Sequence, residues 1–246
     1  MVNILHHHPK GEVVDAPALE QFQKDWALYR TLVEHDALFH RAVADHLHDA
    51  LATAFDRPFS LVDLACGDAF VIRGALEGTK VAHYHGVDLS MPALELASQT
   101  LEGAPFEVVL DHADFVEAVT ARDAHADAFW FGLSLHHLAT DGKRALMTAI
   151  RRAIAPDGLF LVYEPTMRPD EDRAAYLARF DAVNRPLWGA VLSEEQWQAI
   201  DAHVHACDLP ETPEGWLRLG HEAGFSHACE IYAAPTDLYR MYRFDP

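Results

Sequence analysis

The sequence predicts a single α/β domain, residues 1–246, in which helices cover both faces of a mostly parallel, seven-stranded sheet. Between residues 60 and 165, short apolar runs alternate with helical stretches, a pattern typical of right-handed crossovers between parallel strands. Two later strand candidates, 226–233 and 238–244, are joined by a short turn that favours an antiparallel hairpin. The length of 246 residues suits one domain with embellishments.

Each predicted element follows from its own apolar pattern. From residue 18 to 55, apolar residues recur at helical spacing, with a break near residues 34–36, and we expect these two helices to form an N-terminal lid. Residues 166–223 are helical segments interrupted by prolines, which predicts an insertion that covers the substrate. The core strands are expected at 60–65, 81–87, 106–110, 126–131 and 159–163, and the hairpin closes the sheet over 226–244.

Composition excludes several classes of partner. The chain has 19 Lys and Arg against 38 Asp and Glu, a formal net charge of −19 that the 17 histidines make somewhat less negative, so it should repel nucleic acid. The 3 cysteines include no CxxC pair, which favours a reducing cytoplasm over a disulfide framework. Neither a signal peptide nor a membrane span is visible. We expect a cytoplasmic monomer or homodimer with no nucleic-acid or membrane partner.

The first segment that carries chemistry is LVDLACGDAF, residues 61–70. It reads as an apolar strand that ends in an acid, a turn of small residues and the start of a helix. Ligands of open parallel sheets bind at the carboxyl ends of the strands, where the N–H groups of such a turn face them. A tight turn without a ligand is the alternative reading.

A second acid, Asp88, is expected at the tip of the next strand. Its distance from the first turn suits a carboxylate that accepts hydrogen bonds from both ribose hydroxyls of a nucleoside cofactor. An N-cap role for Asp88 is the alternative, but Ser90 suits that role better, because Pro92 follows it in the first helical turn.

These motifs resemble the class I S-adenosylmethionine-dependent methyltransferases, whose fold is Rossmann-like. The resemblance covers residues 60–163 well and the C-terminal hairpin loosely. Where that family has acid-x-Gly-x-Gly-x-Gly, this chain has Asp63, Ala65, Gly67 and Ala69. Alanine keeps the turn small but disfavours positive φ, so the two replacements put the backbone path beside the methionine end of the cofactor in question.

The resemblance implies which residues bind S-adenosylmethionine. Asp88 would hold the ribose and Leu89 would pack on the adenine. Asp114 would accept a hydrogen bond from the adenine amino group, and the Phe115 N–H would face a ring nitrogen. Without this resemblance, Asp114 and Phe115 would be interpreted simply as the start of a helix.

The remaining site residues follow the fourth and fifth strands. Phe131 and Gly132 would offer backbone carbonyls to the methionine amino group. His136 and His137 enter the transfer site as candidate bases, with His136 slightly favoured, because imidazole accepts a proton near neutral pH. Helix capping and packing are the other reading of this pair. The list of candidates is completed by Glu164, which would orient the base or touch the substrate, and by Tyr29 with Trp26 and Arg30, which would close over the cofactor.

Two other constellations in the insertion are weaker. HVHAC, residues 203–207, has metal-ligand residue types, with His221 or His227 to complete a set, but residues two apart on a helix point to different faces, so no metal is expected. Three tryptophans, Trp188, Trp197 and Trp216, could line a substrate pocket, but the core of the insertion is the favoured reading.

The sequence therefore predicts transfer of a methyl group from S-adenosylmethionine to an O, N or C atom of a small-molecule acceptor. One alternative is a protein that binds S-adenosylmethionine for a non-methylating or regulatory purpose. A less favoured one is an NAD-dependent oxidoreductase, because the run from Ala65 to Phe70 lacks G-x-G-x-x-G.

Overall fold

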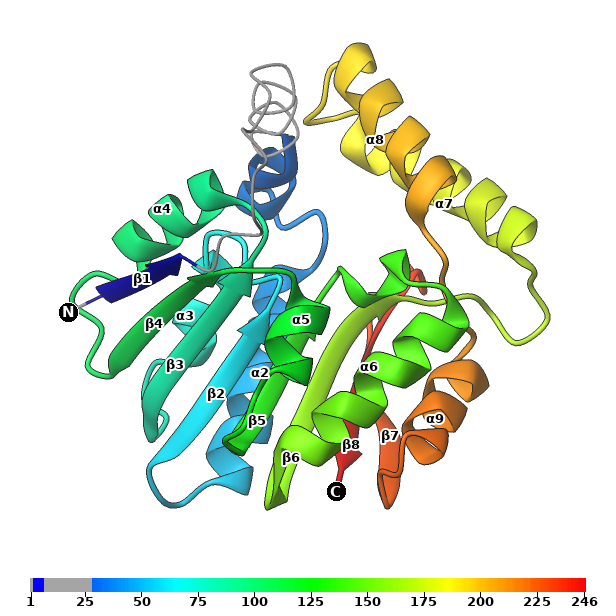
Figure 1. The fold of residues 1–246 in the computed structure, drawn as a ribbon. Coiled ribbons are helices and arrows are strands. Elements are labelled where there is room, and N and C mark those ends of the chain that lie inside the picture. Colours follow the sequence, from blue (N-terminus) through cyan, green and yellow to red (C-terminus); the bar gives the residue numbers. More distant parts are fainter. Residues whose placement is uncertain (1, 7–27) are drawn as a thin grey trace.

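A computed structural model describes residues 2–6 and 28–246 of the chain (Figure 1). It contains one mixed sheet of 8 strands in the order β1-β4-β3-β2-β5-β6-β8-β7. All neighbouring pairs are parallel except those that involve β8. The strands are β1 Val2–His6, β2 Phe59–Leu64, β3 Val81–Asp88, β4 Glu107–His112, β5 Ala126–Gly132, β6 Ile154–Pro165, β7 His227–Ala233 and β8 Tyr239–Asp245.

The predicted fold class is confirmed, with one strand more than expected. The seven predicted strands are present, and the C-terminal pair β7–β8 is antiparallel, as is β8 against β6. The additional strand, β1, pairs in parallel with the edge strand β4, with Val2 opposite Val108. Its partner lies about a hundred residues away in the chain, so a run of five residues near the terminus gave no local sign of it.

Helices cover both faces of the sheet, as predicted (Figure 1). Successive side chains of β5 point to opposite faces of the sheet, so Trp130 packs in the hydrophobic core on one face and Phe131 in the core on the other. The first face is covered by α2 His40–Ala54, α3 Phe70–Ala75 and α4 Met91–Thr100, and the second by α5 Phe115–Thr120, α6 Thr140–Ala153 and α9 Pro213–Glu222.

The helices of the insertion divide into two groups. α7 Arg173–Trp188 and α8 Glu194–Cys207 stand beyond the carboxyl ends of the parallel strands (Figure 1). α9 packs instead against α6 and β7, and its Trp216 is fully buried beside Tyr242. Only the segment 173–207 is therefore in the position of a lid. None of the helices among the described residues is long and apolar enough to cross a membrane.

Of the three tryptophans predicted to form the core of the insertion, Trp188 and Trp197 do so, whereas Trp216 packs under the sheet beside Tyr242. Trp188 also lines a cavity. Trp188 and Trp197 pack edge to face, with ring centroids 6.1 Å apart, and Phe180 lies against both. Of the two N-terminal helices predicted over 18–55, the second is α2, and residues 28–34 are helical. The rest of the first, with Trp26, lies outside the described residues.

Candidate active site

The turn between β2 and α3 has the backbone path of a glycine-rich turn although it contains two alanines. Ala65 has φ 55°, Gly67 has φ 55° and Ala69 has φ 57°. Each alanine in this left-handed region costs about 1–2 kcal/mol relative to ordinary backbone geometry. Strain of this kind collects at ligand-binding turns. The two alanines therefore keep the expected path at the expense of strain.

Asp88 closes this turn from the end of β3. Its Oδ2 accepts a hydrogen bond from Gly67 N at 2.8 Å, and its Oδ1 accepts one from Ser90 N at 2.8 Å. Each carboxylate oxygen has a further lone pair, so the side chain can also accept from a diol. Burial raises the pKa of Asp88, although the two backbone donors oppose that shift. Ser90 caps α4, as expected from the sequence.

Asp63, at the end of β2, is a buried acid within the same site. Its side chain is only 3% exposed, and Oδ2 accepts a hydrogen bond from the Tyr84 hydroxyl at 2.6 Å. Burial raises the pKa of Asp63 to about 7, and the neighbouring charge of Asp88 adds to the shift while Tyr84 opposes it. The charge of Asp63 therefore changes near neutral pH.

A cavity of about 360 Å³, here called the first cavity, opens over these strand ends. It combines the strained turn and both acids with the end of β5. Its walls include Tyr29, His40, Asp63, Ala65, Cys66, Gly67, Asp68, Ala69, Phe70, Asp88, Trp130, Gly132, Leu133, Ser134, His137, Tyr163 and His203. The cavity is therefore lined by the candidate base His137 and by six of the predicted cofactor-binding residues: Tyr29, Asp63, Ala65, Gly67, Asp88 and Gly132.

Other predicted cofactor residues do not line this cavity. Leu89 is 62% exposed, and Phe131 is fully buried behind the strand end. Asp114 caps α5, accepting hydrogen bonds from Val116 N at 2.8 Å and Glu117 N at 3.1 Å. The ring of Phe115 packs on Phe131. The structure thus shows the helix-start role of Asp114, while adenine recognition by Leu89, Asp114 and Phe115 stays a prediction.

Beyond β5, Glu164 organises a short helical turn, η1 Leu135–His137. Its Oε1 accepts hydrogen bonds from Ser134 N at 3.2 Å and Leu135 N at 2.9 Å, and its Oε2 accepts one from His136 N at 3.2 Å. Just before η1, Leu133 has φ 56°, which is strained for a leucine and turns the chain across the strand ends. Glu164 is fully buried and acts on η1, rather than facing a cavity.

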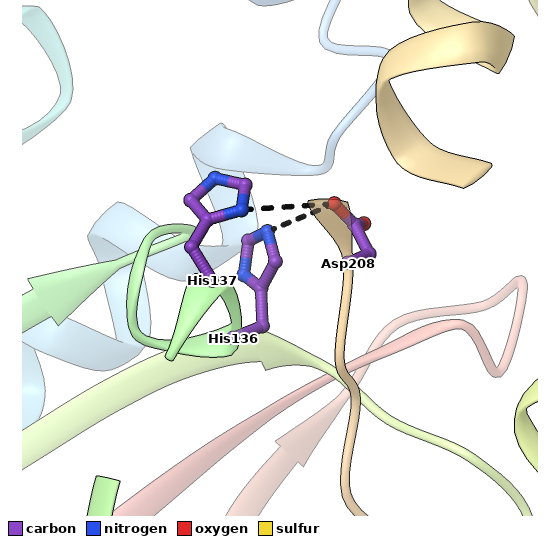
Figure 2. A group of neighbouring side chains, drawn as sticks. All are labelled: His136, His137 and Asp208. Atoms are coloured by element: carbon purple, nitrogen blue, oxygen red, sulfur yellow. Dashed lines mark ion pairs between the residues drawn. The ribbon is translucent and has the colours of Figure 1, made fainter. Parts of the chain in front are cut away.

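His136 is held between the carboxylates of Glu164 and Asp208, and Figure 2 shows the contact with Asp208. Its Nδ1 lies 2.6 Å from Glu164 Oε2, and its Nε2 lies 3.4 Å from Asp208 Oδ1. Burial lowers the pKa of His136, but the charges of Glu164 and Asp208 outweigh it and raise that pKa to about 9. Without a bound ligand the ring is therefore cationic at neutral pH and poorly suited to accept a proton.

His137 has the opposite character. Its side chain is 38% exposed, and burial together with the charge of His136 lowers its pKa to about 4. Its ring packs against His136 at 4.1 Å between centroids and against His203 at 5.4 Å. The geometry therefore favours His137, rather than His136, as the residue that faces a reacting group.

A second cavity of about 270 Å³ adjoins the first. It lies between the helical residues 28–34, η1 and the helices α7 and α8. Tyr29, Leu133, His137 and His203 line both cavities. The remaining wall is largely apolar and includes Leu28, Leu32, Leu38, Phe180, Trp188, Ile200 and Val204, and its polar residues include His136, Asp208 and Tyr239.

Asp208 is the functional candidate that the sequence did not reveal. It follows α8 and reaches η1 because Leu209 N donates a hydrogen bond to His136 O at 3.0 Å. No local pattern marks this approach, since Asp208 lies about seventy residues beyond the histidines it faces. The only local hint was the neighbouring 203–207 run, whose His203 reaches both cavities.

Comparisons with known proteins agree with this geometry. Residues 61–158 match the family model of the methyltransferase domain. A trans-aconitate 2-methyltransferase from Acidovorax sp. (strain JS42) is 27% identical over 176 residues, which cover 70% of this chain and 60% of that protein. The chain thus spans less than two thirds of this relative.

Solved structures share the fold. An O-methyltransferase family protein from Burkholderia thailandensis matches with a TM-score of 0.64 and 16% identity, over 94% of this chain and 60% of that one. The complex of DhpI with SAH matches with a TM-score of 0.56 and 15% identity, over 91% of this chain and 96% of that one. At these identities the likeness establishes the fold.

Proposed function

We propose that this chain is a class I S-adenosylmethionine-dependent methyltransferase that transfers a methyl group from S-adenosylmethionine to a small molecule bound in the second cavity. The observation that carries this proposal is the pair of adjoining cavities. The first is lined by polar groups that suit the cofactor, and the second is largely apolar. They meet at His137, beside the end of β5.

The first cavity has groups that fit each polar part of the cofactor. Asp88 has lone pairs left for the ribose hydroxyls. The Gly132 carbonyl and the acid of Asp63 face the end of the cavity that suits a cationic amino group. Tyr29 lines both cavities and would close over the bound cofactor.

The proposed reaction requires mainly that the protein hold the acceptor atom in line with the methyl carbon and the sulfur. S-adenosylmethionine supplies an electrophilic methyl group on a sulfonium, and an in-line attack by the acceptor releases a neutral thioether. The residues around the junction, Leu133 and His137, would hold the acceptor atom in line and exclude water. His137 lines both cavities and follows the end of β5, so among the polar side chains at the junction we assign it the contact with the acceptor.

The wall of the second cavity limits the acceptor. No lysine or arginine lines either cavity among the described residues, although a polyanion is normally bound by such side chains. The curated relative is named for trans-aconitate, an anion, whereas no matching cation lines either cavity among residues 2–6 and 28–246. We therefore propose a small, largely apolar acceptor with one polar group directed at His137.

Incubation with methyl-tritiated S-adenosylmethionine tests the proposal. The protein is mixed with a metabolite extract freed of protein and nucleic acid, and the products are separated by chromatography. We expect a labelled small molecule with the native chain and a much weaker label with Asp88→Asn. Binding of S-adenosylhomocysteine without any labelled product would contradict methyl transfer, and label entering only added protein or RNA would contradict the acceptor class.

A further inference from the structure

We infer that His136, His137 and Asp208 form a binding site for a divalent transition-metal ion of the zinc type, at the junction of the two cavities. His136 and His137 belong to η1, and Asp208 follows α8, so the site links the core to the insertion (Figure 2). One ligand atom from each residue lies within 4.8 Å of the other two.

The separations suit a shared ion. Two ligand atoms that each lie about 2.0–2.1 Å from a tetrahedral ion are about 3.4 Å apart. His136 Nε2 and Asp208 Oδ1 are 3.4 Å apart, and His137 Nδ1 is 3.9 Å from the same oxygen. A direct N–H···O hydrogen bond would bring such atoms to about 2.9 Å. A small rotation of the half-exposed His137 ring completes the set.

Glu164 supports this role of His136. Its carboxylate lies 2.6 Å from Nδ1, on the side of the ring opposite the proposed ion. Histidine ligands of metals commonly direct their other nitrogen to a carboxylate, which fixes the ring and leaves Nε2 as the ligand. Glu164 is itself held by the backbone N–H groups of η1, so the ring has little freedom.

Asp208 is a buried carboxylate whose nearest cation among the described residues is the His136 ring. It is only 5% exposed, and its Oδ1 lies 3.4 Å from His136 Nε2 without a closely aligned hydrogen bond from the part of the chain that the structure describes. A buried carboxylate in this state is unfavourable unless a cation or donor meets it. The backbone next to it is firmly placed, because Leu209 O accepts a hydrogen bond from Lys143 Nζ and Leu209 N donates one to His136 O at 3.0 Å.

Three protein ligands leave a position open toward the second cavity, the arrangement of catalytic rather than structural zinc sites. If the proposed function holds, this position would take an oxygen of the acceptor. The ion would lower the pKa of an acceptor hydroxyl, whose proton leaves to water. The oxygen then forms the bond to the methyl carbon, while the C–S bond breaks and sulfur keeps the electron pair. The acceptor class thereby narrows to oxygen nucleophiles.

Cobalt binding tests the site without needing the acceptor. Because His6, His7 and His8 could bind metal themselves, every sample carries His6→Gln, His7→Gln and His8→Gln. After dialysis against EDTA and removal of the chelator, Co²⁺ is added and its visible absorption recorded. We expect one equivalent to give the intense spectrum of tetrahedral Co²⁺, and Zn²⁺ to displace it.

Asp208→Asn and His137→Gln should each weaken Co²⁺ binding at least about 10-fold. The control is His205→Gln, which removes a ligand from the other candidate cluster, Asp181, Asp201 and His205, on the surface. It should leave the spectrum unchanged. Retained S-adenosylhomocysteine binding shows that each variant is folded.

Absent tetrahedral Co²⁺ absorption, or an identical spectrum for the Asp208→Asn variant, would overturn the site. The two proposals fail separately. Undiminished methyl transfer after chelation, with no cobalt spectrum, refutes the ion and leaves the function standing. A cobalt spectrum that depends on Asp208, with no methylated product, supports the site and refutes the function.

Discussion

The two halves of the active site are built in different ways. The cofactor half, formed by the ends of β2 and β3, relies on backbone geometry and on acids in the last residues of these strands. The acceptor half brings together side chains from the helical residues 28–34, η1 and α8, which are remote from one another in the chain. A fold shared widely can thus keep one cofactor site while its acceptor site changes through side chains on the covering helices.

The largest expected effect is a loss of turnover that leaves cofactor binding intact, which would separate the acceptor half of the site from the cofactor half. His137→Gln should lower the turnover of the labelled product by about 100-fold, because it removes the side chain to which we assign the contact with the acceptor. It should leave the affinity for S-adenosylhomocysteine nearly unchanged, as measured by calorimetry. His205→Gln, on the exposed face of α8, is the matched control and should be fully active. Equal losses of binding and turnover in His137→Gln would show that the halves are not separable.

A substitution in the cofactor half should instead weaken binding of the cofactor. Asp88→Asn should weaken S-adenosylhomocysteine binding by about 10- to 100-fold, since charge-assisted hydrogen bonds to the ribose are lost. The variant also replaces an oxygen that holds the turn, so thermal unfolding should be followed in parallel. Unchanged affinity in a folded variant would remove Asp88 from the cofactor site.

A smaller effect concerns pH. Asp63 has a pKa of about 7 because it is buried, so it is neutral below that pH and negative above it. A negative Asp63 attracts the cationic amino group of the ligand, and the affinity for S-adenosylhomocysteine should therefore rise several-fold between about pH 6 and pH 8. Calorimetry at a series of pH values should show a flatter profile for Asp63→Asn. The same slope in both proteins would assign the dependence to another group.

The smallest effect is on stability. Ala65→Gly relieves positive φ in the turn but adds chain entropy to the unfolded state, so the free energy of unfolding should rise by about 0.5–1 kcal/mol. Urea unfolding of the two proteins measures the difference. Matched replacement of Ala82, an alanine in β3 without positive φ, by glycine should instead destabilise. Destabilisation by Ala65→Gly would mean that its methyl group matters more than the strain.

The contrast between the halves also explains what the sequence could predict. Asp63, Gly67 and Asp88 were found because each lies at or just after the carboxyl end of a strand, where ligands of a parallel sheet bind. The strand β1 and the residue Asp208 were not, since both act on partners far away in the chain. The roles of His136 and His137 depend on which ring lies between two carboxylates, and that is decided by Glu164 and Asp208 together.

A crystal structure with S-adenosylhomocysteine tests the central claim most directly. The account predicts one ligand in the first cavity, with its ribose on Asp88 and its sulfur at the junction beside Leu133 and His137, facing the second cavity. A ligand seated in the second cavity, or a sulfur directed away from His137, would contradict it.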